Sequence, residues 1–411
     1  MLLVTPPNSY RIAAYLGAAR ALGIAPVVAS PGRHSLIGEL AAGVHIDLHD
    51  PAAGRLLLAA AARQPFDGVV ATDDAAVQLA SEVAATLGLP HNPPLAARLS
   101  RRKDLARACL QQAGVPVPAH RRIELDRPLA PQLEGLRYPV VVKPVSLSAS
   151  RGVLRADDPA ACRRACARIE AMLAREQDLP AAERRLLLIE AFVEGPELAV
   201  EALLHEGELE LLAVFDKPDP LQGPCFEETY YVTPSRHDPR DLALAVGTVA
   251  RACRAYGLRE GPVHAELRLA RGQAWVMEVA SRTIGGECAR LLRFGAGADL
   301  ETLVLQRALG RPVEVQPPED AAGVLMLPIP GAGVLRRVEG VLAARRVPYI
   351  EELILSVREG YELVPLPEGG SYLGFLFARA PTPAQAEAAL REAHDKLKVV
   401  IAPLFSIQQT L

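Results

Sequence analysis

Two glutamates on a hairpin predicted over residues 261–282 are the first groups that could do chemistry. If the hairpin has a three-residue loop at residues 271–273, Glu266 lies directly opposite Glu278. The apolar residues then share the other face: Ala265, Leu267, Leu269, Trp275, Met277 and Val279. A two-residue loop would mix the two faces. Paired carboxylates repel one another unless a cation separates them, and oxygen ligands suit Mg²⁺. The alternative is a solvated polar face without a metal.

A lysine follows a strand that the sequence predicts to be buried. Residues 140–142 are three valines, which favour a strand, and Lys143 comes next, before a loop of small hydroxyl residues at 146–152. A buried ammonium needs a partner to stay charged. The chain has five lysines among its 45 basic residues, so lysine is kept at few places, and Lys103 and Lys143 both lie beside other suggestive residues.

The segment after Glu278 adds a cation and two glycines. Arg282 follows the predicted strand, and Gly285 and Gly286 allow a backbone to approach a ligand closely. An arginine next to metal-bound carboxylates can neutralise a phosphoryl group in transfer. The alternative is a surface arginine at a turn. His264 alternates with Glu266 and is either a neighbour that supports the site or an ordinary strand histidine.

Taken in order, these residues resemble the ATP-grasp superfamily over nearly the whole chain. The order is Lys103, Lys143, the small-residue loop, the hinge-like stretch IEAFVEGPE at 189–197, the two glutamates and Arg282. Within the superfamily the chain is similar to L-amino-acid ligases, in FDKPDPLQGPCFEETYYVTPS (215–235) and from about residue 320. The resemblance implies an ATP-grasp fold of mixed α/β and α+β type.

The resemblance also implies roles for residues. Lys103 and Lys143 would hold the ATP phosphates, so that the phosphates would be the partner of Lys143, and the resemblance makes Lys143 and Arg282 catalytic. The loop would close over the phosphates through Ser148, Ser150 and Gly152. The adenine would meet Glu190, Ala191, Phe192 and Val193, and the ribose Glu197. Glu266 and Glu278 would bind Mg²⁺ or Mn²⁺. The candidate substrate pocket comprises Lys217, Phe226, Glu227, Glu228, Gly285 and Gly286.

The reaction that the resemblance implies is ATP-dependent amide formation. A carboxylate takes the γ-phosphate and an amine attacks the acyl-phosphate, which a lid at about residues 117–185 would shield from water. One alternative is a carboxylase that activates bicarbonate. The other is an ATP-binding module without turnover, which Ala280 admits because relatives often have asparagine there, as does the single glycine of the loop.

The elements that must position these residues alternate along the chain. Strands and helices predicted before residue 90 indicate a parallel sheet, and Asp73 and Asp74 are typical of a helix N-cap. We expect an N-terminal α/β domain at 1–94, an ATP-grasp domain at 95–311 and a small α+β domain at 312–411.

Composition excludes some classes of partner. The net charge of −3 gives no basic surface for nucleic acid, and no apolar run suits a membrane span. Six scattered cysteines and the absence of a signal-peptide pattern predict a reduced, cytoplasmic protein with small-molecule substrates. A homodimer is common among the proteins that it resembles.

Overall fold

A computed structural model describes residues 1–7, 9–31, 42–294, 298–313, 315 and 320–404. The chain divides into two compact units, each built from three segments. The first unit comprises Met1–Pro118, Leu198–Val214 and Asp238–Pro318, and the second comprises Ala119–Glu197, Phe215–His237 and Glu319–Leu411. The polypeptide therefore passes from one unit to the other several times, twice within a strand: at residues 197–198 and at residues 214–215.

The first unit begins with a four-stranded parallel sheet, as the alternating pattern predicts. Its strand order is β3-β2-β1-β4, and every neighbouring pair is parallel. The strands are β1 (Leu2–Val4), β2 (Val27–Ser30), β3 (Ala42–His45) and β4 (Val69–Ala71). The helices are α1 (Ile12–Ala21), α3 (Ala53–Arg63) and α4 (Val77–Thr86). Leu2 and Val4 join the core formed with α3 and α4, because alternate side chains of a strand share a face.

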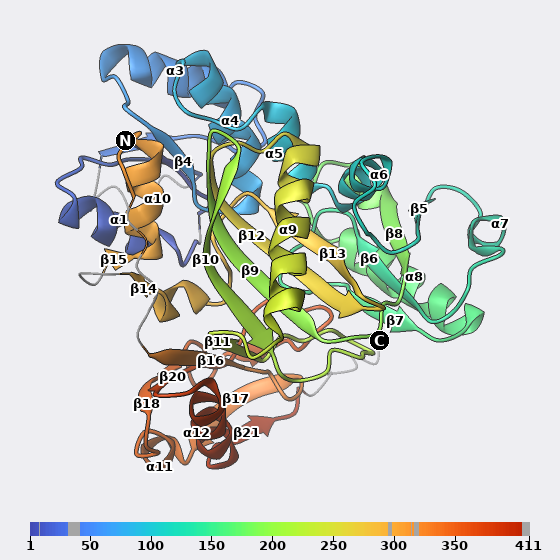
Figure 1. Cartoon of the computed structure of the whole chain (residues 1–411). Coiled ribbons are helices and arrows are strands. Elements are labelled where there is room, and N and C mark those ends of the chain that lie inside the picture. Colours follow the sequence, from blue (N-terminus) through green and yellow to red (C-terminus); the bar gives the residue numbers. More distant parts are fainter. Residues whose placement is uncertain (8, 32–41, 295–297, 314, 316–319, 405–411) are drawn as a thin grey trace, which may run out of the picture. The chain divides into compact units, whose positions relative to one another are not determined.

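The rest of the first unit places longer strands beside helix α9 (Pro239–Tyr256). The strand order is β13-β12-β9-β10, and α9 lies across one face of these strands (Figure 1). The strands are β9 (Glu197–His205), β10 (Glu208–Lys217), β12 (Gly261–Ala270) and β13 (Gln273–Ala280), with the short β14 (Arg293–Phe294) and β15 (Ala298–Asp299). The helices are α5 (Pro94–Arg101), α6 (Lys103–Gln112) and α10 (Leu300–Ala308), with the 3₁₀ turns η1 (Asp74–Ala76) and η3 (Cys288–Leu291).

The hairpin of β12 and β13 has the predicted glutamate pair but not the predicted loop. Ala270 pairs with Gln273 across a two-residue turn, in which Arg271 and Gly272 have φ of 53° and 69°. A β-bulge after Glu266 then shifts the register by one residue, so that Glu266 faces Glu278. The prediction that Trp275 and Met277 join the apolar face is wrong. Ahead of the bulge, the alternate residues Ala274 and Val276 are buried instead.

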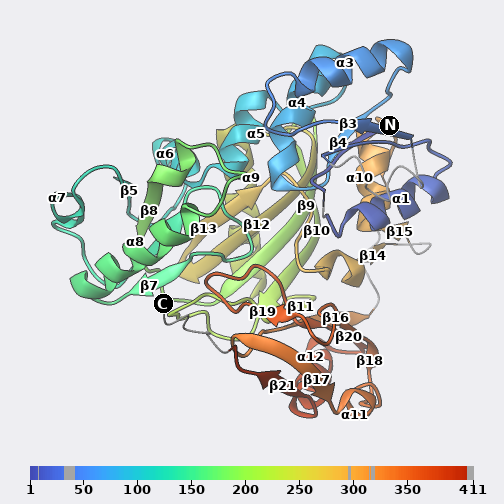
Figure 2. The same ribbon diagram turned by 180° about the vertical axis from the view of Figure 1, so that it is seen from behind.

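The second unit contains a four-stranded antiparallel sheet of order β5-β8-β6-β7. Its strands are β5 (His120–Glu124), β6 (Val140–Pro144), β7 (Leu154–Ala156) and β8 (Leu186–Ala191). Its helices are α7 (Leu129–Leu133) and α8 (Pro159–Leu173), with η2 (Glu183–Arg185). Helix α8 packs along this sheet (Figure 2). It begins after Asp158, whose side chain accepts a hydrogen bond from the Ala161 N–H at 2.7 Å.

The remainder of the second unit combines strands with two helices, most of them from the C-terminal part of the chain. Strands run in the order β11-β16-β20-β18, and a second sheet has the order β19-β17-β21. The strands are β11 (Tyr230–Thr233), β16 (Ala321–Leu327), β17 (Gly333–Glu339), β18 (Ile350–Leu355), β19 (Glu362–Leu363), β20 (Gly374–Ala380) and β21 (Lys398–Ala402). Helices α11 (Val341–Ala344) and α12 (Pro383–Asp395) complete it, and Leu376 and Leu390 lie in its core.

All six cysteines are free thiols. Within the described ranges, no helix combines the length and apolar character that crossing a membrane requires.

Candidate functional site

The predicted site residues divide between the two units. The first unit contains Lys103, Glu266, Glu278, Arg282, Gly285 and Gly286. The second contains Lys143, Ser148, Ser150, Gly152, Glu190, Ala191, Phe192, Val193, Glu197, Lys217, Phe226, Glu227 and Glu228. The two groups of residues are therefore described separately below.

In the first unit the paired glutamates each have a basic partner. Lys103, the first residue of α6, places its ammonium 3.2 Å from the Glu278 carboxylate. His264 places Nε2 3.5 Å from Glu266. Ala280, the position at which relatives often have asparagine, is buried and pairs with His264 across the hairpin. Opposed carboxylates with partly exposed side chains offer the oxygen donors that a divalent cation prefers, so these residues fit the predicted metal.

His264 is buried and supports Glu266 from behind. Its Nδ1 lies 3.1 Å from Glu201, a fully buried carboxylate that also accepts the Ile284 N–H at 3.1 Å. Burial disfavours the charged ring, but hydrogen bonds to Glu201 and Glu266 outweigh it and raise the pKa of His264 to about 9. The imidazolium thus links two carboxylates, which supports the interpretation that His264 belongs to the site rather than being an ordinary strand histidine.

Arg282 is buried beside Asp74, a contact that the sequence did not reveal. Its Nε donates to the Asp74 carboxylate at 3.0 Å. Burial opposes the charge of each partner, but their mutual attraction prevails, so the pKa of Arg282 is raised and that of Asp74 is lowered. Asp74 had been predicted only as part of a helix N-cap. The position of Asp74, a carboxylate just after a predicted strand, could have indicated that it belongs to a ligand site.

The carboxyl ends of β1 and β4 form a polar cluster around this pair. Asp73 accepts hydrogen bonds from Ser9 and Arg11, each at 2.5 Å, and makes no side-chain cap bond, so the capping prediction is wrong for Asp73. The Gly286 N–H donates to the Tyr10 hydroxyl at 3.0 Å. The strand order reverses between β1 and β4, and such a switch point is where open α/β sheets bind ligands.

In the second unit Lys143 has a protein partner. Its ammonium forms an ion pair with Glu190, and the two residues are 7% and 3% exposed. Val141 pairs with Glu190 across β6 and β8, which brings the two side chains together. The sequence predicts that phosphates are the partner of Lys143, and the structure adds Glu190, which supplies an opposite charge from within the protein. For Glu190 the sequence predicted only a main-chain contact to adenine.

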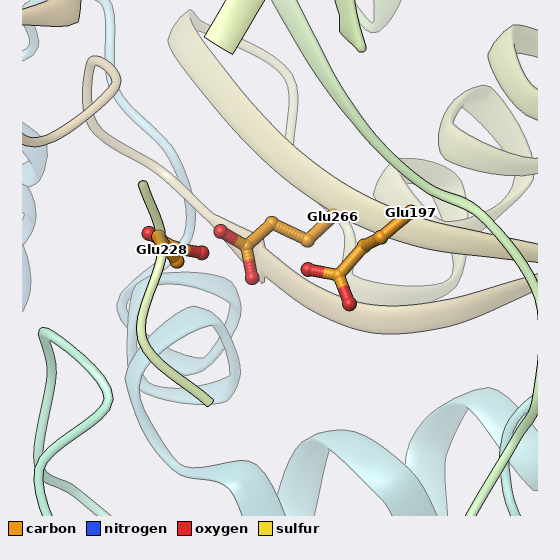
Figure 3. Close-up of side chains that lie close together, drawn as sticks. All are labelled: Glu197, Glu228 and Glu266. Atoms are coloured by element: carbon orange, nitrogen blue, oxygen red, sulfur yellow. The ribbon is translucent and has the colours of Figure 1, made fainter. Parts of the chain in front are cut away.

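Lys217 holds two of the other candidate carboxylates. Its ammonium lies 2.7 Å from Glu197 and 2.5 Å from Glu228. The side chains of both glutamates are drawn in Figure 3, where they come from separate segments of the second unit. The ring of Tyr231 lies 4.9 Å from the same ammonium. A predicted ribose acceptor and two predicted substrate residues are thus gathered at one cation.

Aromatic residues lie between the hinge-like stretch and the candidate substrate loop. The rings of Phe192 and Phe226 are 6.2 Å apart, and the Arg155 guanidinium lies 4.4 Å from the Phe192 ring. Burial raises the pKa of Glu227, so this carboxyl is more easily protonated than usual. Two aromatic rings and the Arg155 guanidinium thus lie together in the second unit.

The small-residue loop is in a compact conformation. Ala149, Ser150 and Gly152 have φ of 54°, 55° and 69°, the left-handed region that tight turns use. The Gly152 N–H donates to the Pro367 carbonyl at 3.0 Å. In this conformation the Gly152 N–H therefore donates to another part of the protein, although the sequence predicts that it contacts a phosphate.

Three domain families match the chain. Residues 16–91 match an ATP-grasp N-terminal domain, residues 136–290 an ATP-grasp domain, and residues 325–402 the L-amino acid ligase C-terminal domain 2.

Similar proteins agree with these matches. An L-amino acid ligase from Bacillus licheniformis has 28% identity and a TM-score of 0.84, with 98% of each chain covered. Carnosine synthase 1 from Gallus gallus is 30% identical over 286 residues, which cover 66% of this chain and 30% of that protein. Alanine–anticapsin ligase from Bacillus subtilis is 24% identical over 254 residues, which cover 58% of this chain and 53% of that protein.

Proposed function

We propose that this chain, a member of the ATP-grasp superfamily, joins two amino acids, or a small carboxylate and an amino acid, in a dipeptide-type bond. It is an ATP-dependent carboxylate–amine ligase, in agreement with the reaction that the sequence predicts. The observation that carries the finer proposal is the match of residues 325–402 to the L-amino acid ligase C-terminal domain. The likeness over 98% of the Bacillus licheniformis ligase supports it.

In this proposal the second unit binds the nucleotide. Lys143 presents an ammonium whose charge Glu190 maintains, so it is ready for phosphate oxygens before ATP arrives. Ser148 and Ser150 offer hydroxyl groups from the loop, while residues 190–193 offer main-chain groups to the base. Glu197 accepts from the ribose in exchange for part of its contact with Lys217.

The first unit supplies the charges for phosphoryl transfer. Glu266 and Glu278 would hold Mg²⁺, which would neutralise the phosphate oxygens. The Lys103 ammonium lies 3.2 Å from the Glu278 carboxylate. If Glu278 held the metal, Lys103 could bind a phosphate oxygen instead. Arg282, oriented by Asp74, stabilises the negative charge that spreads over the transferred group.

The reaction has two steps. The substrate carboxylate attacks the γ-phosphorus of ATP, so that a C–O–P linkage forms and ADP leaves. A neutral amine then attacks the acyl carbon, phosphate leaves, and the amine loses a proton as the amide forms. The acyl-phosphate hydrolyses in water, so the loop must stay closed between the steps.

The amino acid that provides the amine is proposed to lie near Gly285 and Gly286. Glycines without side chains allow the backbone to approach a ligand closely beside the β1–β4 switch point. Glu227 and Glu228 are proposed to meet the ammonium of the amino acid that is activated. We further propose that the substrates are small molecules and that the enzyme is a homodimer, which light scattering on the purified protein tests.

The experiment is phosphate release from Mg-ATP across a panel of amino acid pairs, with mass spectrometry of the products. Release that needs both amino acids and yields a dipeptide mass supports the proposal. Bicarbonate-dependent release without an amide indicates a carboxylase instead. Lys143→Ala and Glu278→Gln are expected to lose turnover, and circular dichroism checks that each variant is still folded at the assay temperature. Turnover retained by both would refute the site.

A further inference from the structure

A loop of the C-terminal part, residues 365–370, contacts the small-residue loop within the second unit. The contact includes the Gly152 N–H, which donates to the Pro367 carbonyl at 3.0 Å. The Arg151 Nε also donates to the Glu368 carbonyl at 3.3 Å. Both donors come from the segment proposed to cover the phosphates, and both acceptors are backbone oxygens more than two hundred residues further along the chain.

A bidentate ion pair reinforces this contact from helix α8. Arg168 donates through Nε and Nη2 to the two oxygens of Glu368, at 2.6 Å and 2.8 Å. Two parallel bonds between planar groups fix orientation as well as distance. The Arg151 guanidinium is itself held by Glu176, with its nearest nitrogen at 2.5 Å. Three segments of the second unit therefore meet at one place.

The glycines of residues 365–370 allow this close fit. A Cβ atom on Gly370 would lie 2.5 Å from the Arg151 Cδ atom. A Cβ atom on Gly369 would lie 1.8 Å from the Val364 carbonyl oxygen. A larger residue at 369 would have to shift the backbone, and one at 370 would have to displace the Arg151 side chain from its place against the loop. The sequence Pro-Glu-Gly-Gly therefore suits the contact.

We propose that residues 365–370, through Glu368 and its partner Arg168, act as a clamp that positions the small-residue loop in its closed form. The proposal rests on the proposed function for its catalytic meaning, because a closed loop would protect the acyl-phosphate from water. Glu368 and Arg168 are positioning residues, since they act on the nucleotide through residues 151 and 152. The C-terminal part thereby controls how much ATP is wasted by hydrolysis.

The direct test is hydrogen exchange of the full-length protein without substrates, followed in peptides that span residues 146–153. The Gly152 amide reports the clamp because its partner is Pro367. Glu368→Gln and Arg168→Ala are expected to speed exchange there by roughly threefold to fivefold, the effect of losing one partly exposed ion pair. The charge swap, Arg168→Glu with Glu368→Arg, is expected to restore slow exchange.

A matched control removes a similar ion pair from the same unit. Glu339→Gln breaks the contact with the Arg337 Nε, at 2.7 Å on β17, and is expected to leave exchange at 146–153 unchanged. In assays with Mg-ATP and an accepted amino acid pair, Glu368→Gln is expected to raise the KM for ATP a few fold. It is also expected to raise the phosphate released per amide formed, with kcat for total phosphate release nearly unchanged.

Unchanged exchange in both Glu368→Gln and Arg168→Ala, or a charge swap that restores nothing, would overturn the clamp. Calorimetry with Mg-ATP separates this result from failure of the proposed function. Faster exchange in the variants, together with no nucleotide binding by the unaltered protein, would uphold the clamp and reject the phosphate-binding role of the loop.

Discussion

Replacing Glu301 with glutamine is expected to stabilise the first unit above neutral pH. Glu301 lies in the first turn of α10, is 5% exposed, and burial raises its pKa from 4.5 to about 7. The folded protein therefore binds a proton that the unfolded chain has lost between these two pH values. Stability falls as pH rises through that window, because ionising the buried carboxyl is costly.

The magnitude follows from the width of that window. Each pH unit between 4.5 and 7 costs about 1.4 kcal/mol, which gives roughly 3 kcal/mol at pH 8 as an upper value. A glutamine has the same shape and no charge, so the variant avoids this cost. The expected net gain is about 2 kcal/mol at pH 8 and close to zero at pH 4.

The assay is urea unfolding at a series of pH values, followed by the fluorescence of Trp275. This is the one tryptophan of the sequence, and it lies in the same unit as Glu301. Glu82→Gln, on the exposed side of α4, is the matched control and is expected to show no pH-dependent difference. If Glu301→Gln is no more stable than the unaltered protein at pH 8, the reasoning from burial is refuted.

Three further predictions concern the candidate site. Lys143→Ala removes the ion-pair partner of the buried Glu190 carboxylate and is expected to lower the free energy of unfolding by about 3–5 kcal/mol. Replacing both residues with apolar ones is expected to recover most of this loss. Thermal unfolding of the single and double variants checks this, and a double variant no more stable than the single one would contradict it. Asp74→Asn is expected to reduce the loss of folding stability at low pH. The lowered pKa of Asp74 contributes stability that is present above about pH 4 and lost as pH falls further. Acid-unfolding curves that superimpose for the two proteins would exclude this role. Tyr10→Phe removes the acceptor for the Gly286 N–H and is expected to weaken binding of the amine substrate by about 1 kcal/mol, roughly fivefold in its KM. The unfolding temperature is expected to change little. Steady-state kinetics with the amine substrate varied provides the test, and an unchanged KM would count against a pocket at this loop.

The local sequence pattern predicted the β12–β13 hairpin and its glutamate pair, but not the length of its turn or its bulge. The pairing of Glu266 with Glu278 is confirmed, although two departures from the predicted geometry cancel one another: a shorter turn and a bulge. A bulge depends on how a strand packs, which alternation in the sequence does not encode. For this reason Trp275 and Met277 were assigned to the wrong face.

Partners distant in sequence were beyond reach of the sequence alone. The lysine at the end of β6 was correctly predicted to need an opposite charge, but the choice of Glu190 depends on the antiparallel pairing of β6 with β8. Asp73 follows the local rule for a helix cap, yet Ser9 and Arg11 reach it from the end of β1. Local rules fail at such places because tertiary contacts compete for the same atoms.

The division of each unit into three segments has a consequence for biosynthesis. The core of the first unit combines Ala96, Val200, Val249 and Val263, which come from all three of its segments. On the ribosome, residues 1–118 emerge first but cannot complete this core until the chain has been made past residue 279. The nascent chain therefore exposes apolar surface through most of translation, and we expect it to depend on chaperones more than a protein with sequential domains does.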